Sequence, residues 1–159
     1  MTLMLRLGLR AGEAASLKFE DLNWRLGTIT VAGKRGRVDA LPLPVDVGES
    51  LVAYLRTGRP AGTMHRQVFL SIDAPHSSMT SIAVTNMVAH AMRRAGISGA
   101  GAAHRLRHTA AMSVIATGGG LIEAGQLLRH TSVSSTAIYA RADIGGLAIL
   151  VRPWPGGER

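Results

Sequence analysis

The chain has 159 residues, a length typical of a single ordinary domain. Its apolar fraction of 47% excludes wholesale disorder, and the absence of cysteine excludes disulfides and thiolate metal sites. Its 18 Lys and Arg residues outnumber its 10 Asp and Glu residues, and the resulting net charge of +8 favours a polyanion as partner, either nucleic acid or an acidic membrane surface. No apolar run approaches the length of a membrane span, and the N-terminus lacks the charged lead of a signal peptide, so we expect a cytoplasmic protein with no membrane partner.

Hydrophobic periodicity predicts a mainly helical α+β domain with a small three-stranded antiparallel sheet near its beginning. We expect one domain over 1–150 and an extended Pro/Gly-rich tail over 151–159. Ser81 is expected to cap a long helix that reaches about Ala95 and that Gly96 closes. In chain order the expected elements are a helix over 1–7, a turn over 9–12, a helix over 13–17, strands over 28–31 and 38–43 joined by a hairpin at 33–36, a helix over 46–57, a strand or extended run over 68–70, and helices over 81–95, 104–117 and 121–128.

One stretch, from His104 to Tyr139, concentrates side chains that suit a phosphodiester. His104, Arg107 and His108 are three and four residues apart, so a helix presents them on one face. His130 follows the next apolar helix, where a turn can present it toward the same side, and Tyr139 comes nine residues later. Guanidinium groups clamp phosphate oxygens and a phenol can attack phosphorus, so these residue types fit phosphoryl chemistry.

Two basic residues earlier in the chain could also serve phosphoryl chemistry, but each has a plainer interpretation as well. Arg10, at a helix entrance, is either a solvated surface charge or an anion ligand backed by backbone amides. Lys34 near the hairpin tip is either a solubilising loop residue or a proton donor, because lysine, unlike arginine, can release its proton near neutral pH. A basic DNA-binding module with structural His and Tyr residues also remains open.

Two other kinds of site are disfavoured. His104 and His108 have the spacing of zinc-binding helices, but no glutamate lies between them and no cysteine completes a shell, so we expect no metal. The chain contains no Gly-x-Ser-x-Gly sequence, the motif that is typical of serine hydrolases, so this class of enzyme is disfavoured.

Five motifs in order resemble the catalytic domain of the tyrosine recombinases, the phage-type integrases of mobile elements, which share a fold with type IB topoisomerases. The resemblance runs from Leu7 to about Gly157. The motifs are Gly-Leu-Arg-Ala-Gly-Glu at 8–13, Gly-Lys at 33–34, His-Arg-Leu-Arg-His-Thr at 104–109, Leu-Leu-Arg-His at 127–130 and Thr-Ala-Ile-Tyr at 136–139, and the ending Pro-Trp-Pro-Gly-Gly at 153–157 is also similar.

The resemblance implies metal-free and cofactor-free strand transfer on double-stranded DNA. Tyr139 attacks the scissile phosphate and forms a 3′-phosphotyrosyl link, while Arg10 and Arg107 stabilise charge on the phosphorus. His104 and His130 bond the phosphate or relay the tyrosine proton, and Lys34 protonates the departing 5′-oxygen. The remaining expected site residues are Glu13 and His108, which orient the others, and Arg35, Arg37, Arg105 and Arg129, which contact DNA.

The sequence departs from the family pattern in several places. Arg129 stands where glycine is more usual, and Arg141 where histidine is frequent. The chain begins close to the first arginine motif, so we interpret it as a catalytic domain without the N-terminal core-binding domain. The resemblance implies a homo-tetramer on DNA for the full-length protein, with accessory DNA-bending proteins as further partners. The rival functions are a type IB topoisomerase and a truncated remnant that binds DNA weakly without turnover.

Overall fold

The computed structural model describes residues 1–33 and 36–129. Four predicted site residues, Lys34, Arg35, His130 and Tyr139, lie outside the described residues, as do Arg141 and the expected tail. The chain forms two compact units, Met1–Ala110 and Ala111–Arg159.

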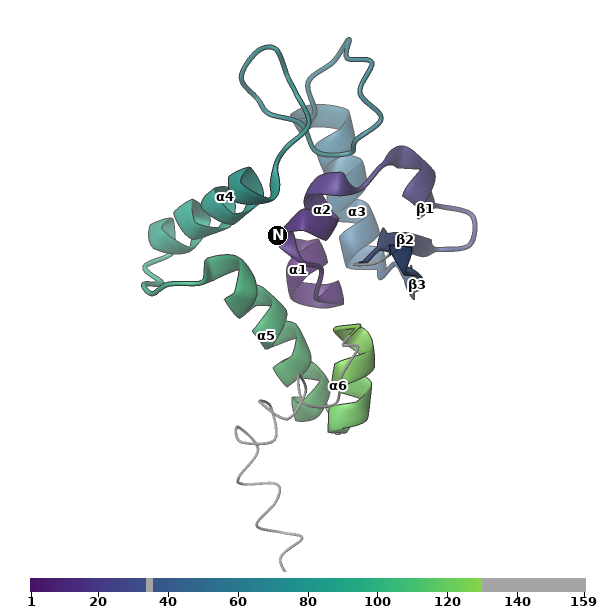
Figure 1. The fold of residues 1–159 in the computed structure, drawn as a ribbon, viewed down its shortest axis with the longest axis vertical. Helices are drawn as coiled ribbons and strands as arrows, with labels where there is room; N and C mark the ends of the chain where they lie inside the picture. Colours follow the sequence, from purple (N-terminus) through teal and green to yellow (C-terminus); the bar gives the residue numbers. More distant parts are fainter. Residues whose placement is uncertain (34–35, 130–159) are drawn as a thin grey trace, which may run out of the picture. The chain divides into compact units, whose positions relative to one another are not determined.

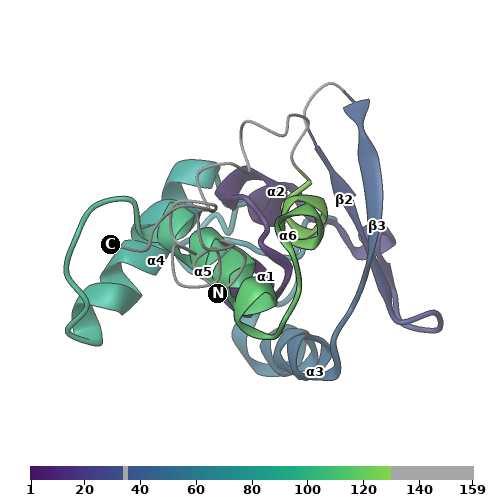
Figure 2. The same ribbon diagram turned by 90° about the horizontal axis from the view of Figure 1, so that it is seen from below.

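The first unit contains short helices and a small sheet (Figure 1). Helix α1 packs against α2 and α3, and α2 packs against α4, as the two ribbon views show (Figures 1 and 2). In chain order its elements are α1 (Thr2–Leu7), α2 (Ala11–Ser16), the 3₁₀ turn η1 (Phe19–Asp21), β1 (Leu22–Asn23), β2 (Thr28–Ala32), β3 (Val38–Pro42), α3 (Val45–Ala53), the π-helical turn η3 (Tyr54–Gly58), α4 (Ser81–Arg94) and the beginning of α5 (Ala102–Ala116).

The three strands form an antiparallel sheet in the order β1-β2-β3, which confirms the expected sheet. The predicted hairpin is also present: Gly33 N–H donates to the Arg37 carbonyl at 2.7 Å, and Gly36 adopts a left-handed φ of 75°. The third strand is β1, whose two residues are too few for an alternating pattern to predict. The run over 68–70 is extended, but there Leu70 makes only an isolated bridge to Ser78.

Alternation along β2 buries one face of the sheet. Ile29 and Val31 are buried, whereas their neighbours Thr28 and Thr30 are half-buried. Complete burial of such an aliphatic side chain stabilises the fold by about 1.5–3 kcal/mol. The sheet thereby packs onto the helices in a cluster of Leu3, Leu7, Leu9, Ala14, Leu17, Leu22, Ile29, Val31, Val47, Leu51 and Val68.

Helix α4 packs through one stripe, since Val84, Val88 and Met92 are four residues apart and all buried. Its N-cap is Thr80 and not Ser81 as expected: the Thr80 hydroxyl accepts the Ala83 amide at 3.1 Å. The stripe belongs to a second cluster of Met4, Ala15, Val84, Val88, Met92 and Ala102, which joins α1, α2, α4 and the start of α5.

The described part of the second unit consists of the end of α5 and helix α6 (Leu121–Leu127). Ala111, Ala124 and Leu128 are fully buried and form its core. Gly118 follows α5 with a left-handed φ of 90°, which agrees with the helix end that was predicted at 117.

Several predicted helix boundaries differ from the structure, and α5, which was expected to begin at His104, already begins at Ala102. The turn expected over 9–12 is shorter, because α2 already begins at Ala11 with Arg10 as its N-cap. The helix expected over 46–57 divides into α3 and the π-helical η3. Among the described residues, no helix combines the length and apolarity needed to cross a bilayer.

Candidate active site

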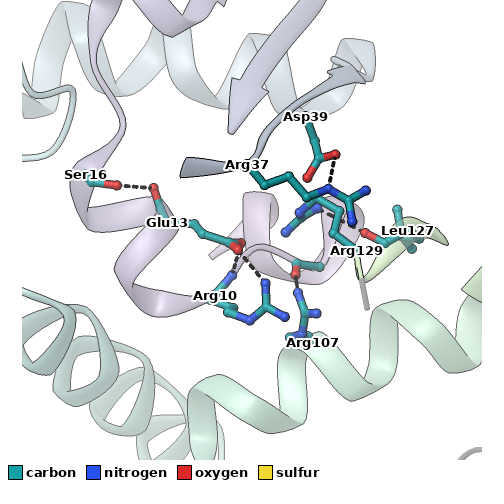
Figure 3. A network of polar contacts seen from close by, with 9 residues as sticks. Arg10, Glu13, Ser16, Arg37, Asp39, Arg107, Leu127 and Arg129 are labelled. Carbon is teal, nitrogen blue, oxygen red and sulfur yellow. Dashed lines mark hydrogen bonds and ion pairs between the residues drawn. The ribbon is translucent and has the colours of Figure 1, made fainter. Parts of the chain in front are cut away.

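Arg10 lies at the N-cap of α2 and is held by a residue one turn later. Its backbone amide donates to Glu13 Oε2 at 2.8 Å and its Nη1 donates to Glu13 Oε1 at 2.6 Å (Figure 3). The side chain of Glu13 is 6% exposed and that of Arg10 is 40% exposed. Glu13 is also favourably placed in the first turn of the helix, where the dipole stabilises a carboxylate. The carboxylate therefore fixes a half-exposed guanidinium close to the helix entrance.

Arg107 comes from the middle of α5 and is buried, with only 5% of its surface exposed. Its Nη1 donates to the backbone carbonyl of Gly8, across 99 positions of sequence. Because Gly8 precedes Arg10 by two residues, this hydrogen bond brings the second arginine motif to the turn that carries the first. A buried guanidinium needs such an acceptor to offset the loss of hydration.

The histidines predicted beside Arg107 differ in exposure. His104, near the start of α5, is exposed, and His108 is half-buried. The helical spacing therefore places all three on the same element, but only Arg107 is buried. Arg105, expected to contact DNA, is exposed and its Nη1 donates to the Ser98 carbonyl at 2.6 Å, which closes the connection between α4 and α5.

The hairpin after β2 carries another arginine that is held by an ion pair. Arg37 Nε donates to Asp39 Oδ1 at 2.8 Å, and the two side chains are 49% and 17% exposed. Asp39 is opposite Val31 in the register and so lies on the face of the sheet that packs inward. Its Oδ2 is buried and has no hydrogen-bond partner among the described residues. Asp39 thus holds Arg37 at the base of the hairpin, a contact that sequence patterns did not predict.

Arg129 ends the described part of the chain in an unusual conformation. Its φ of 52° is left-handed, it is 6% exposed, and its Nη1 donates to the Leu127 carbonyl at 3.0 Å. For a residue with a Cβ this conformation costs roughly 1–2 kcal/mol, which explains physically why glycine suits the position. The predicted DNA contact of Arg129 stays a prediction.

Other features of the described residues lie away from these side chains. A mostly apolar cavity of about 680 Å³ is lined by residues such as Met1, Leu51, Phe69 and Met87, and by none of the predicted site residues. No group of three His, Asp or Glu side chains in the described ranges is arranged to hold a metal ion.

The arrangement places one half-exposed and one buried guanidinium at the same turn. Both arginines are anchored at the Gly8–Arg10 turn, one by a carboxylate and the other by a carbonyl. Guanidinium groups held in place by other bonds need little reorganisation to stabilise developing negative charge. The predicted roles of Lys34, His130 and Tyr139 remain predictions from the sequence.

Comparison with known proteins points to one family. The sequence pattern of the phage integrase family matches residues 1–144. The putative integrase/recombinase y4rA of Sinorhizobium fredii is 40% identical over 155 residues, which cover 96% of this chain and 37% of that protein. A second protein of the same organism, the putative integrase/recombinase y4gC, is 34% identical over 161 residues, 99% of this chain and 82% of the relative. The chain therefore spans well under half of the first relative and most of the second.

Solved recombinases have the same fold. The crystal structure of the XerA recombinase superposes with a TM-score of 0.80 at 25% identity and covers 96% of this chain and 57% of that one. The XerH site-specific recombinase, bound to a palindromic difH substrate in a post-cleavage complex, superposes with a TM-score of 0.76 at 26% identity, covering 92% of this chain and 42% of that one. The fold and the match over residues 1–144 agree, and the chain belongs to the phage integrase family of tyrosine recombinases.

Proposed function

We propose that this chain is the catalytic domain of a site-specific DNA recombinase that cleaves and rejoins strands through a 3′-phosphotyrosyl intermediate. The observation that carries the proposal is the hydrogen bond from buried Arg107 to the Gly8 carbonyl. It joins two arginine motifs that are far apart in sequence, as a clamp on one phosphate requires. Membership of the phage integrase family supports the same reaction class.

In the proposed reaction the hydroxyl oxygen of Tyr139 attacks the scissile phosphorus. The bond from phosphorus to the 5′-oxygen breaks, the DNA 3′ end becomes esterified to tyrosine, and the 5′-oxygen takes a proton from Lys34. Arg10 and Arg107 stabilise the negative charge that develops on the non-bridging oxygens. His104 and His130 hydrogen-bond the phosphate or accept the tyrosine proton. A 5′-hydroxyl from another strand then reverses the steps, and the phosphotyrosyl bond conserves the energy needed for rejoining.

Double-stranded DNA is the proposed partner, and the net charge of +8 favours it. Arg35, Arg37, Arg105 and Arg129 are the proposed contacts to its backbone, which fix position without reading sequence. The proposed assembly is a homo-tetramer that acts on two duplexes in the cytoplasm, with accessory DNA-bending proteins as further partners.

The test is covalent capture on nicked duplexes. A pool with randomised sequence around a nick is incubated with the protein; cleavage just upstream of the nick releases a short 5′-hydroxyl fragment, so rejoining fails. We expect an adduct that survives denaturation and retains a label at the 5′ end of the cut strand. Sequencing the captured DNA then identifies the preferred site.

Tyr139→Phe removes only the attacking oxygen and should abolish the adduct. The matched control is Tyr54→Phe, since Tyr54 is the other tyrosine of the chain and its hydroxyl accepts a long bond, 3.3 Å, from the Leu70 amide. Absence of an adduct at every protein concentration would contradict the proposal and leave a DNA-binding remnant. An adduct with relaxation of supercoils but no exchange between duplexes would instead identify a topoisomerase.

A further inference from the structure

The end of α1 has a backbone geometry that Gly8 alone among its neighbours can adopt without strain. Gly8 has φ 59° and ψ 30°, in the left-handed region. Its N–H donates to the Leu3 carbonyl, and the following amide, that of Leu9, donates to the same carbonyl at 3.4 Å. The Leu9 side chain is completely buried. Hydrogen bonds and packing therefore fix the peptide unit between Gly8 and Leu9 from both sides.

This peptide unit determines the direction of the Gly8 carbonyl. In a trans peptide the carbonyl and the following N–H point in opposite directions. Because the Leu9 N–H points back into α1, the Gly8 oxygen points away from that helix, and Arg107 Nη1 meets it there. The left-handed turn at Gly8 is thus directly coupled to the placement of a guanidinium on α5.

We propose that Gly8 is a positioning residue for the reaction: its left-handed backbone directs the carbonyl that orients the Arg107 guanidinium toward the scissile phosphodiester beside Arg10. The inference rests on the proposed strand-transfer function and adds to it a main-chain group that touches no substrate. The guanidinium has five N–H donors in a rigid plane, so a hydrogen bond to one of them orients the others.

A side chain at position 8 tests this coupling. Alanine strongly disfavours the left-handed region, whereas asparagine adopts it more readily. If residue 8 leaves that region, the carbonyl turns away from Arg107. A misplacement of about 1 Å at a reacting centre lowers the rate by as much as about 100-fold.

Gly27 provides a matched control. Its φ is 60°, nearly the same as that of Gly8, and it is exposed with open space around the position of a Cβ. Its carbonyl accepts a bond from the Leu43 amide at 2.8 Å and no arginine contact is described for it. Gly27→Ala therefore introduces the same backbone strain without disturbing Arg107.

The experiment compares Gly8→Ala, Gly8→Asn and Gly27→Ala in the full chain by two readouts. The first is the Arg107 side-chain NMR signal without DNA, and the second is the single-turnover rate of adduct formation on a nicked duplex at saturating protein. We expect Gly8→Ala to shift the Arg107 signal and lower the rate by about 10- to 100-fold, with Gly8→Asn restoring most of both. Gly27→Ala should leave both near the values of the unchanged protein.

Equal rate losses in Gly8→Ala and Gly27→Ala, or an unchanged Arg107 signal in Gly8→Ala, would overturn the inference. If Gly8→Ala does not fold, Arg107→Met tests the same hydrogen bond by removing its donor. Arg107→Met should then shift the NMR signal of the Gly8 carbonyl carbon, and Arg105→Met should not. A protein that forms no adduct refutes the proposed function, while the NMR signals still decide whether Gly8 orients Arg107.

Discussion

The two arginines of the candidate site are anchored in different ways. Arg10, half-exposed, is bonded by the carboxylate of Glu13, three residues away on the same short helix. Arg107 is buried and bonded by a main-chain carbonyl 99 residues away. The first anchor is local and ionic; the second is long-range and uses no side chain of its partner. Both meet at the turn that contains Leu9.

This difference predicts how each arginine responds to mutation of its partner and to salt. A carboxylate can be replaced by mutation directly, and its attraction to an exposed guanidinium is weakened by salt. A backbone carbonyl changes only when the chain around it changes, so Arg107 depends on the path of the whole Gly8–Arg10 turn. We therefore expect substitutions in and around the two anchors to reduce the stability of the fold by different amounts.

The largest effect should follow from Leu9→Ala, because Leu9 connects the two anchors and is completely buried. Removal of a buried leucine side chain costs about 2–5 kcal/mol in the free energy of unfolding. Urea denaturation monitored by circular dichroism measures the change. Leu5→Ala is the control: Leu5 lies within α1, four residues before Leu9, is 38% exposed, and its loss should cost clearly less. Similar losses in both variants would show that Leu9 does not tie the turn to the core.

An intermediate effect is expected from Arg107→Met, which keeps much of the side-chain volume but removes the donor to Gly8. A buried carbonyl that loses its donor destabilises the protein by about 1–3 kcal/mol. The control on the same helix is Arg105→Met, whose exposed side chain donates to Ser98, and a change of about 0.5 kcal/mol or less is expected there. If Arg105→Met lowered the urea midpoint more than Arg107→Met does, the result would contradict the interpretation of Arg107 as a buried anchor.

The smallest effect should come from Glu13→Gln. The single amide oxygen of glutamine can still accept the Arg10 backbone N–H, but its NH2 group cannot accept the second bond, from Arg10 Nη1. The ion pair is therefore lost, and because the guanidinium is half-exposed we expect a cost of about 0.2–1 kcal/mol. Thermal midpoints at low and high salt measure it, and the difference from the unchanged protein should shrink as salt rises. Glu49→Gln, at an exposed carboxylate with no described ion pair, should show no such difference. A loss that is independent of salt would indicate that Glu13 acts by packing alone.

Much of the fold follows from short-range patterns. The Gly33–Gly36 hairpin, the stripe of Val84, Val88 and Met92 and the glycine stops of the helices were predictable because turn chemistry and periodicity act over a few residues. The two-residue strand β1 was not predictable, since pairing with β2 and not local preference makes it a strand. The sequence pattern also did not distinguish Thr80 from Ser81 as the cap of α4, because both adjacent residues carry a hydroxyl that suits this position.

For the candidate site, helical spacing in the local sequence singled out Arg107 with its neighbouring histidines, whereas only the resemblance to the recombinase family named Arg10 and Glu13 as site residues. The Arg107–Gly8 contact, the pairing of Arg37 with Asp39 and the left-handed Arg129 became apparent only in the folded molecule. A carbonyl oxygen is present at every residue, so no sequence pattern can indicate which one a distant guanidinium will reach. That choice depends on how α1 and α5 pack, and packing is a property of the whole chain.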